Sequence, residues 1–77
     1  MAEDWPLLAT PDEVRAAIRA EMARYNIEQA DLARSLSMTQ QAVSRRLTGQ
    51  VPLTVEDITH IAVAIGCPAG RLLNPLK

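Results

Sequence analysis

Apolar residues recur every three to four positions along most of this chain, which is the spacing of a helix with one buried face. The first such stretch is predicted to run from Pro11 to about Tyr25. Thr10 can cap its start and Glu13 can reach back to that cap, while Asn26 suits its end. The apolar stripe of this helix is predicted to comprise Val14, Ala17, Ile18, Met22 and Tyr25.

Two shorter helical stretches follow, Gln29–Leu36 and Gln40–Thr48, and residues 37–39 can form the turn between them. Thr39 is expected to cap the second stretch and Gly49 to end it. The positions expected to be buried are Leu32, Ala33, Leu36, Val43 and Leu47.

Two further helices complete the pattern. Thr54 can cap a fourth helix, with Asp57 at the reach-back position and Gly66 at the end. A short fifth helix is predicted over residues 68–73, stopped by Asn74-Pro75. The apolar residues of these two helices are Ile58, Ile61, Ala62, Ile65, Leu72 and Leu73.

The pattern therefore predicts an all-α protein of five helices, with residues 1–9 as an N-terminal arm and residues 10–77 as a single domain. A chain of 77 residues without Phe can build only a modest aliphatic core, which suits packed helices and is too small for a two-layered enzyme. No apolar run approaches the roughly 18 residues of a membrane span. The acidic start lacks a secretory signal and Cys67 is the only cysteine, so we expect a cytoplasmic protein.

Charge is distributed unevenly along the chain. The net charge of −1 alone argues against a nucleic-acid binder. Residues 1–31, however, hold seven acidic residues and three arginines, a net charge of −4, whereas residues 32–49 hold three arginines and no acid. Salt screens charges over about 10 Å, so this cationic segment can still contact phosphate. Non-specific affinity for nucleic acid should be weak, so specific contacts and dimerisation would have to supply most of the binding free energy.

The same segment carries side chains that read DNA bases. Gln40 and Gln41 each offer a donor and an acceptor, which matches N6 and N7 of adenine, although a solvated helix start is the alternative. Arg45 shares their face and can reach guanine or a phosphate, and Ser44 suits a base edge. Arg46 is expected at a flank or a phosphate. The two short helices therefore predict a helix-turn-helix whose second helix enters the major groove.

Residues 11–73 resemble the phage repressor/Cro type of helix-turn-helix domain. The resemblance is carried by Gln29, Leu32-Ala33, Thr39-Gln40-Gln41, Val43-Ser44, Gly49 and the later Ile61-Ala62 and Ile65-Gly66 pairs. It implies a compact lambda-repressor-like fold in which Gln29 binds phosphate, the glutamines at 40 and 41 read bases and Thr48 contacts phosphate. The candidate DNA-binding residues are therefore Gln29, Thr39, Gln40, Gln41, Ser44, Arg45, Arg46 and Thr48.

Two positions depart from that family pattern. Met22 and Leu47 stand where many members have an Arg–Glu pair, and we predict that these two apolar side chains touch. Ser37 stands where the family turn usually has Gly with a positive φ, at a cost on the order of 1 kcal/mol.

The remaining polar residues give no sign of other chemistry. Arg34 and His60 are expected on the surface, and Cys67 is expected to be buried rather than reactive. Trp5 or Leu8 is expected to pack on the domain or across a dimer interface. One His and one Cys cannot form a zinc site, and no catalytic set of residues is apparent, so we expect no enzyme, metal or cofactor.

The leading hypothesis is a sequence-specific double-stranded DNA-binding regulator, a Cro-like repressor that binds a pseudo-palindromic operator as a homodimer. The dimer contact is expected in the connection 51–53 and at Leu72, Leu73 and Leu76. The alternative is an antitoxin or anti-repressor that uses the same fold to bind a protein partner, with or without DNA binding.

Overall fold

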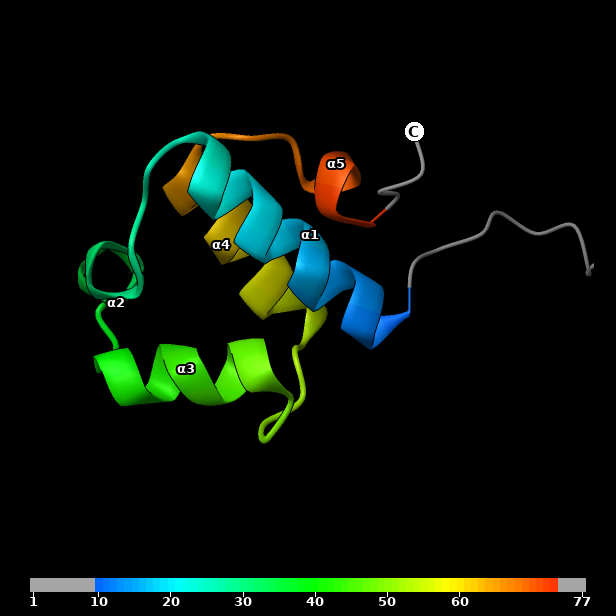
Figure 1. Ribbon diagram of the computed structural model, residues 1–77. Coiled ribbons are helices and arrows are strands. Elements are labelled where there is room, and N and C mark those ends of the chain that lie inside the picture. The colour runs from blue at the N-terminus through cyan, green and yellow to red at the C-terminus, as the bar shows by residue number, and fades with distance from the viewer. Residues whose placement is uncertain (1–9, 74–77) are drawn as a thin grey trace, which may run out of the picture.

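Five helices account for most of residues 10–73, the part of the chain that the computed structural model describes (Figure 1). They are α1 (Pro11–Arg24), α2 (Gln29–Leu36), α3 (Gln40–Thr48), α4 (Val55–Ile65) and α5 (Ala69–Leu73). These residues contain no strand, so the predicted all-α, five-helix fold is confirmed. The predictions for Trp5, Leu8, Asn74-Pro75 and Leu76 fall outside the described residues.

Three of the helices begin with the cap chemistry that the sequence predicts. Before α1, the Glu13 N–H donates to the Thr10 hydroxyl at 3.2 Å and the Thr10 N–H donates to the Glu13 carboxylate at 2.9 Å. Thr54 and Asp57 form the same reciprocal pair before α4, at 2.9 and 3.1 Å. The Thr39 hydroxyl accepts a bond from a backbone N–H of α3 at 3.0 Å. These bonds satisfy N–H groups that have no partner within the helix, and they fix where each helix begins.

Helices α1, α2 and α4 end in a common way, in which a left-handed residue turns the chain back onto the core. The left-handed residues are Asn26, Ser37 and Gly66, with φ of 61°, 56° and 92°. The N–H of the residue that follows each of them donates to the carbonyl five positions earlier, over 2.8 to 3.0 Å. The residues that follow are Ile27, Met38 and Cys67, and all three pack on the core. The same turn therefore ends the helix and supplies another core residue.

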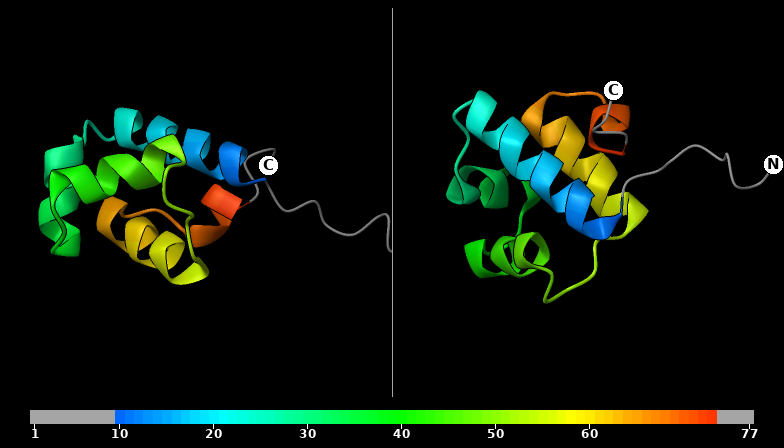
Figure 2. Two further views of the ribbon diagram at one scale, coloured as in Figure 1. Left: turned by 90° about the horizontal axis from the view of Figure 1, so that it is seen from below. Right: turned by 45° about the vertical axis from the view of Figure 1, so that its right-hand side comes forward.

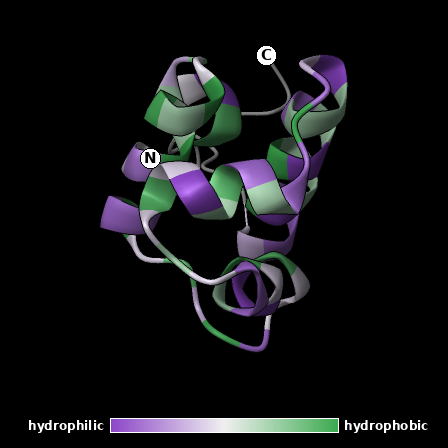
Figure 3. Cartoon of the chain, turned by 90° about the vertical axis from the view of Figure 1, so that its left-hand side faces the viewer, coloured by the Kyte–Doolittle hydropathy of each residue, from purple (hydrophilic) through white to green (hydrophobic). Residues whose placement is uncertain are grey.

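Every helix contributes to one hydrophobic core. Helix α1 packs against α3, α4 and α5, while α2 packs against α3 and α4, and the views in Figure 2 show this arrangement. Figure 3 shows hydrophobic and hydrophilic residues on the same helices, as expected of amphipathic elements around a small core. No helix within residues 10–73 is long and apolar enough to cross a membrane. The most deeply buried residues are Ile18, Leu32, Val43, Leu47, Ile61 and Leu72.

The predicted stripe of α1 is wrong at one position. Tyr25 is 45% exposed, because the helix ends at Arg24 and the backbone of Tyr25 (φ −99°) leaves the helical path. Ile27 packs on the core beyond this turn. Glu21 is buried, and its carboxylate lies 3.6 Å from the guanidinium of Arg71. This ion pair joins α1 to α5.

The two apolar positions that depart from the phage repressor/Cro pattern are both in the core. Met22 of α1 is 6% exposed and Leu47 of α3 is 2% exposed, and the two helices pack against each other. The apolar pair therefore occupies buried space between α1 and α3, while direct contact of the two side chains stays a prediction.

A double-mutant cycle tests that contact. We expect Met22→Arg or Leu47→Glu alone to lower the free energy of unfolding by about 3–5 kcal/mol, because each buries an unpaired charge. The double variant should recover about 1–3 kcal/mol of the summed loss if the two side chains meet. Urea denaturation of the four proteins measures this coupling. Strictly additive losses would show that the two positions do not touch.

Replacing Ser37 tests the strain at the end of α2. The left-handed conformation is costly for serine and free for glycine, so Ser37→Gly should raise the free energy of unfolding by about 0.5–1 kcal/mol after the greater flexibility of unfolded glycine is counted. Asn26→Gly is the matched control, because asparagine tolerates nearly the same φ and should gain less. Thermal or urea denaturation measures both changes. A Ser37→Gly variant no more stable than the wild type would contradict the assignment of strain.

Candidate nucleic-acid interface

Helices α2 and α3 form a helix-turn-helix unit joined by residues 37–39. Ser37 takes the left-handed conformation and Met38 packs on the core, so the turn is anchored at its centre. Helix α3 lies along one side of the domain and packs against α1 and α2 (Figure 1). Its inner face buries Val43 and Leu47. The opposite face is therefore exposed to solvent.

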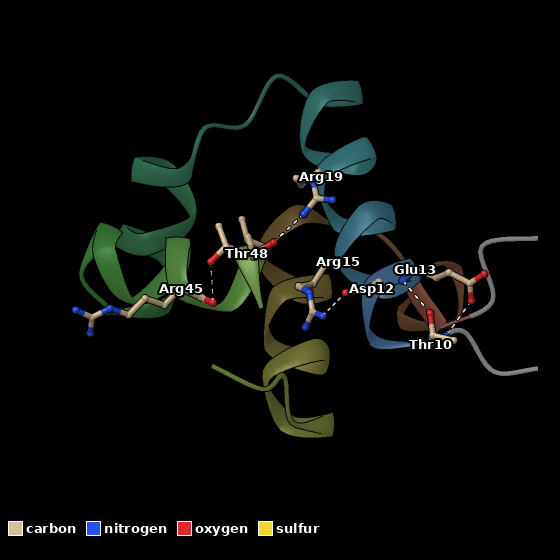
Figure 4. A network of polar contacts seen from close by, with 8 residues as sticks. Thr10, Asp12, Glu13, Arg15, Arg19, Arg45 and Thr48 are labelled. Carbon is tan, nitrogen blue, oxygen red and sulfur yellow. Dashed lines mark hydrogen bonds and ion pairs between the residues drawn. The ribbon is translucent and has the colours of Figure 1, made fainter. Parts of the chain in front are cut away.

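The exposed face of α3 brings together most of the residues predicted to bind DNA. Gln40, Gln41, Arg45 and Thr48 are exposed and Ser44 is half-buried. With about 100° between successive residues, the side chains at 41, 45 and 48 lie opposite the core, and Ser44 lies at the edge of this face. Gln40, seven positions before Leu47, projects from the core side of the helix at its exposed start. Figure 4 shows the Arg45 side chain extending away from the domain, and it forms no ion pair with any residue of the described chain.

The N-terminal end of α3 differs electrostatically from those of α1, α2 and α4. The first turn of α1 contains Asp12 and Glu13, that of α2 contains Asp31, and that of α4 contains Glu56 and Asp57. The first turn of α3 contains no acid, and its cap is the neutral hydroxyl of Thr39. Carboxylates at a helix start compensate its partial positive charge. This charge remains uncompensated at α3, which suits a phosphate group.

Gln29 lies at the first position of α2 and is half-buried. The carboxylate of Asp31 accepts the Glu28 N–H at 3.0 Å and pairs with Arg34 at 2.7 Å, so this helix start carries its own anion. Arg34 is 74% exposed, in agreement with its prediction as a surface residue. Because a carboxylate opposes a phosphate at the same site, the start of α3 is the stronger phosphate site of the two.

Arg46 points away from the exposed face of α3. Its guanidinium donates to the carbonyl of Ala42 at 3.0 Å, and its Nε lies 3.5 Å from the Asp57 carboxylate of α4. The side chain is only 24% exposed. The structure therefore separates Arg46 from the other predicted site residues, and its charge links α3 to α4.

Two arginines of α1 reach the C-terminal end of α3, and the sequence pattern gave no reason to select them. Arg19 Nη1 donates to the carbonyl oxygen of Leu47 at 2.7 Å (Figure 4). The Arg15 guanidinium covers Gly49 so closely that a Cβ there would lie 3.3 Å from its carbon. Their spacing of four residues on α1 was the only available signal, and it identifies a common face but not a partner.

The other residues considered from the sequence lie away from this surface. Cys67 is buried, as predicted, and burial raises the pKa of its thiol, with the Glu21 carboxylate adding to the rise. The thiol is therefore protonated at neutral pH and unreactive. His60 is exposed, also as predicted. With Ser35, Leu36, Val63 and Ala64 it lines a shallow groove of about 280 Å³ between α2 and α4.

Residues 8–76 match the BetR domain family. The chain belongs to the BetR domain family. Among solved structures it is similar to the clp gene regulator ClgR from C. glutamicum, with a TM-score of 0.74 and 18% sequence identity over 83% of this chain and 84% of ClgR. At that identity the likeness shows a shared fold. A comparison with curated proteins gave no match.

Membership of the BetR family refines the resemblance seen in the sequence. The five-helix fold with its helix-turn-helix unit is confirmed, and a solved structure shares it. The matched family is BetR rather than the phage repressor/Cro type, so the Cro-like features remain expectations.

Proposed function

We propose that this BetR-family protein is a sequence-specific double-stranded DNA-binding transcriptional regulator that reads the major groove with α3. The observation that carries the proposal is the exposed face of α3, which combines base-reading side chains with a helix start free of acid. The similar fold of ClgR, described as a gene regulator, supports it. The role requires binding alone, without catalysis or a cofactor, and would be exercised in the cytoplasm on nucleoid DNA.

Within this proposal the site residues divide by chemistry. Gln40, Gln41 and Arg45 read base edges, and Ser44 contacts a base or a nearby phosphate. The start of α3 at Thr39, together with Gln29 and Thr48, contacts the DNA backbone. Arg46 contributes by holding α3 to α4 through Asp57.

We further propose that the protein binds a pseudo-palindromic operator as a homodimer and acts as a Cro-like repressor. Two copies would then place their α3 helices about 34 Å apart, which is one turn of DNA. The expected role of Leu72 in the interface is wrong, because this side chain is fully buried in the core. Leu53 and Leu73 are also partly buried against the core. We therefore place the contact at the connection 51–53 and the adjoining Val55, which is 76% exposed.

Direct reading of bases is tested by removing the amides. The probes are the sequence that the wild type selects from a random duplex pool and a duplex of scrambled sequence. We expect Gln40→Ala and Gln41→Ala each to weaken binding to the selected duplex by about 5- to 100-fold, because a bidentate amide contact contributes about 1–3 kcal/mol. Binding to the scrambled duplex should change little. Titrations by fluorescence anisotropy measure both.

Ser35→Ala is the control for this experiment, since Ser35 is an exposed polar residue of α2 that lies in the groove with α4. It should leave both affinities unchanged. A wild type that selects no sequence, or glutamine variants with undiminished discrimination, would contradict the proposed reading helix.

The dimer surface is tested with two valines of α4 that are equally exposed. We expect Val55→Asp to shift the protein toward monomer and to weaken binding to a two-half-site duplex by at least about tenfold, because it places a charge in an apolar contact. Val63→Asp, at the other end of the helix and also on a residue 76% exposed, should retain the dimer. Sedimentation equilibrium gives the oligomeric state. Equal behaviour of the two variants would exclude the connection as the interface.

The second candidate function is that of an antitoxin or anti-repressor that binds a protein. The groove between α2 and α4 favours it, because Leu36, Val63 and Ala64 give this surface an apolar wall outside the exposed face of α3. The Val63→Asp variant distinguishes the two functions. This substitution should abolish binding of a protein partner and leave DNA binding intact.

A further inference from the structure

The C-terminal end of α3 is covered by arginines from another helix. Arg19 donates to the Leu47 carbonyl at 2.7 Å (Figure 4), and the guanidinium of Arg15 lies over Gly49. Arg15 also pairs with Asp12 and is 13% exposed, so its charge is largely matched and shielded. Arg19 is an exposed residue and forms no ion pair within residues 10–73.

This arrangement removes an electrostatic obstacle to binding a nucleic acid. The C-terminal end of a helix carries a partial negative charge on its unpaired carbonyls. In the major groove, phosphates flank both ends of a helix that lies across it, so one end attracts them and the other repels them. A guanidinium on the Leu47 carbonyl replaces that repulsion with a net positive charge.

The guanidinium of Arg19 also has capacity for a second partner. An arginine offers five N–H donors, and Arg19 uses one of its terminal nitrogens for the Leu47 carbonyl. The exposed Thr48 is the next residue along α3, and its hydroxyl donates to the carbonyl of Arg45 at 3.3 Å. Arg19 and Thr48 both stand at the C-terminal end of α3 (Figure 4), so a phosphate at this end can meet the open donors of Arg19.

We propose that Arg19 is a phosphate-binding residue, which contacts the DNA backbone beside Thr48 while its bond to Leu47 fixes the C-terminal end of α3. This inference rests on the proposed DNA-binding function. The Arg19 contact would come from α1, outside the helix-turn-helix unit. It would lie at the C-terminal end of α3, whereas the free N–H groups lie at the N-terminal end. Arg19 thereby helps to position the recognition helix relative to the DNA backbone, irrespective of base sequence.

The salt dependence of binding tests this proposal. Each phosphate neutralised by a cationic side chain contributes about 0.9 to the slope of log affinity against log salt. We expect Arg19→Gln to reduce that slope by about one and to weaken binding to the selected and the scrambled duplexes by a similar factor, roughly tenfold at low salt. Arg19→Lys retains the charge and should keep the wild-type slope.

Arg34→Gln is the matched control, because it removes the same charge from an exposed arginine that pairs with Asp31. Its slope should equal that of the wild type. An unchanged slope for Arg19→Gln with lost discrimination between the duplexes would overturn the phosphate contact and leave Arg19 a purely structural role. An equal reduction by Arg34→Gln would overturn it as well.

Failure of the proposed function would be seen differently, because the wild type itself would then bind neither duplex. That result would also exclude the Arg19 phosphate contact. Circular dichroism checks that each variant is folded. If Arg19→Gln alone is unfolded, the titration is made in the Ser37→Gly background, with Ser37→Gly as its reference, and the same change in slope decides.

Discussion

Burial of Val43 and Leu47 is the constraint on which the rest of the structure depends. Helix α3 has nine residues, too few to be stable alone in water, so its existence relies on the contacts it makes with α1 and α2. Once these two side chains are buried, the helical repeat fixes the direction of every other residue in α3. Gln41 and Arg45 must then face solvent, and Arg46 must lie on one flank of the helix, where the structure places Asp57 of α4. The candidate interface is thus a consequence of the core.

Charge within the domain follows the helix ends rather than the net charge of the chain. Acidic residues stand in the first turns of α1, α2 and α4, where they stabilise those helices and are matched by nearby N–H groups. The start of α3 has none, and its other end carries the guanidinium of Arg19. A protein with a net charge of −1 can therefore present a positive helix to an anionic partner.

The sequence predicted the helices well because their ends are local. Thr10 with Glu13, and Thr54 with Asp57, are reciprocal caps that depend on residues three positions apart. It predicted long-range polar contacts poorly, because nothing local identifies their partners. Arg46 with Asp57 and Arg19 with Leu47 join different helices, and both were invisible to helical periodicity. The exposed face of α3 was predictable, whereas the contacts that orient it were not.

The hydrogen bond between Arg19 and the Leu47 carbonyl supplies a polar link between α1 and α3, although the residues at 22 and 47 are apolar. A side-chain ion pair between α1 and α3 would need two matched residues and would pay to desolvate both charges. Here the buried positions hold Met22 and Leu47, and a polar link between the same helices runs from an exposed arginine to a main-chain carbonyl. A carbonyl is present whatever the side chain, so this link does not restrict the residue at position 47. The core can therefore be packed for stability while a cation still holds the C-terminal end of α3.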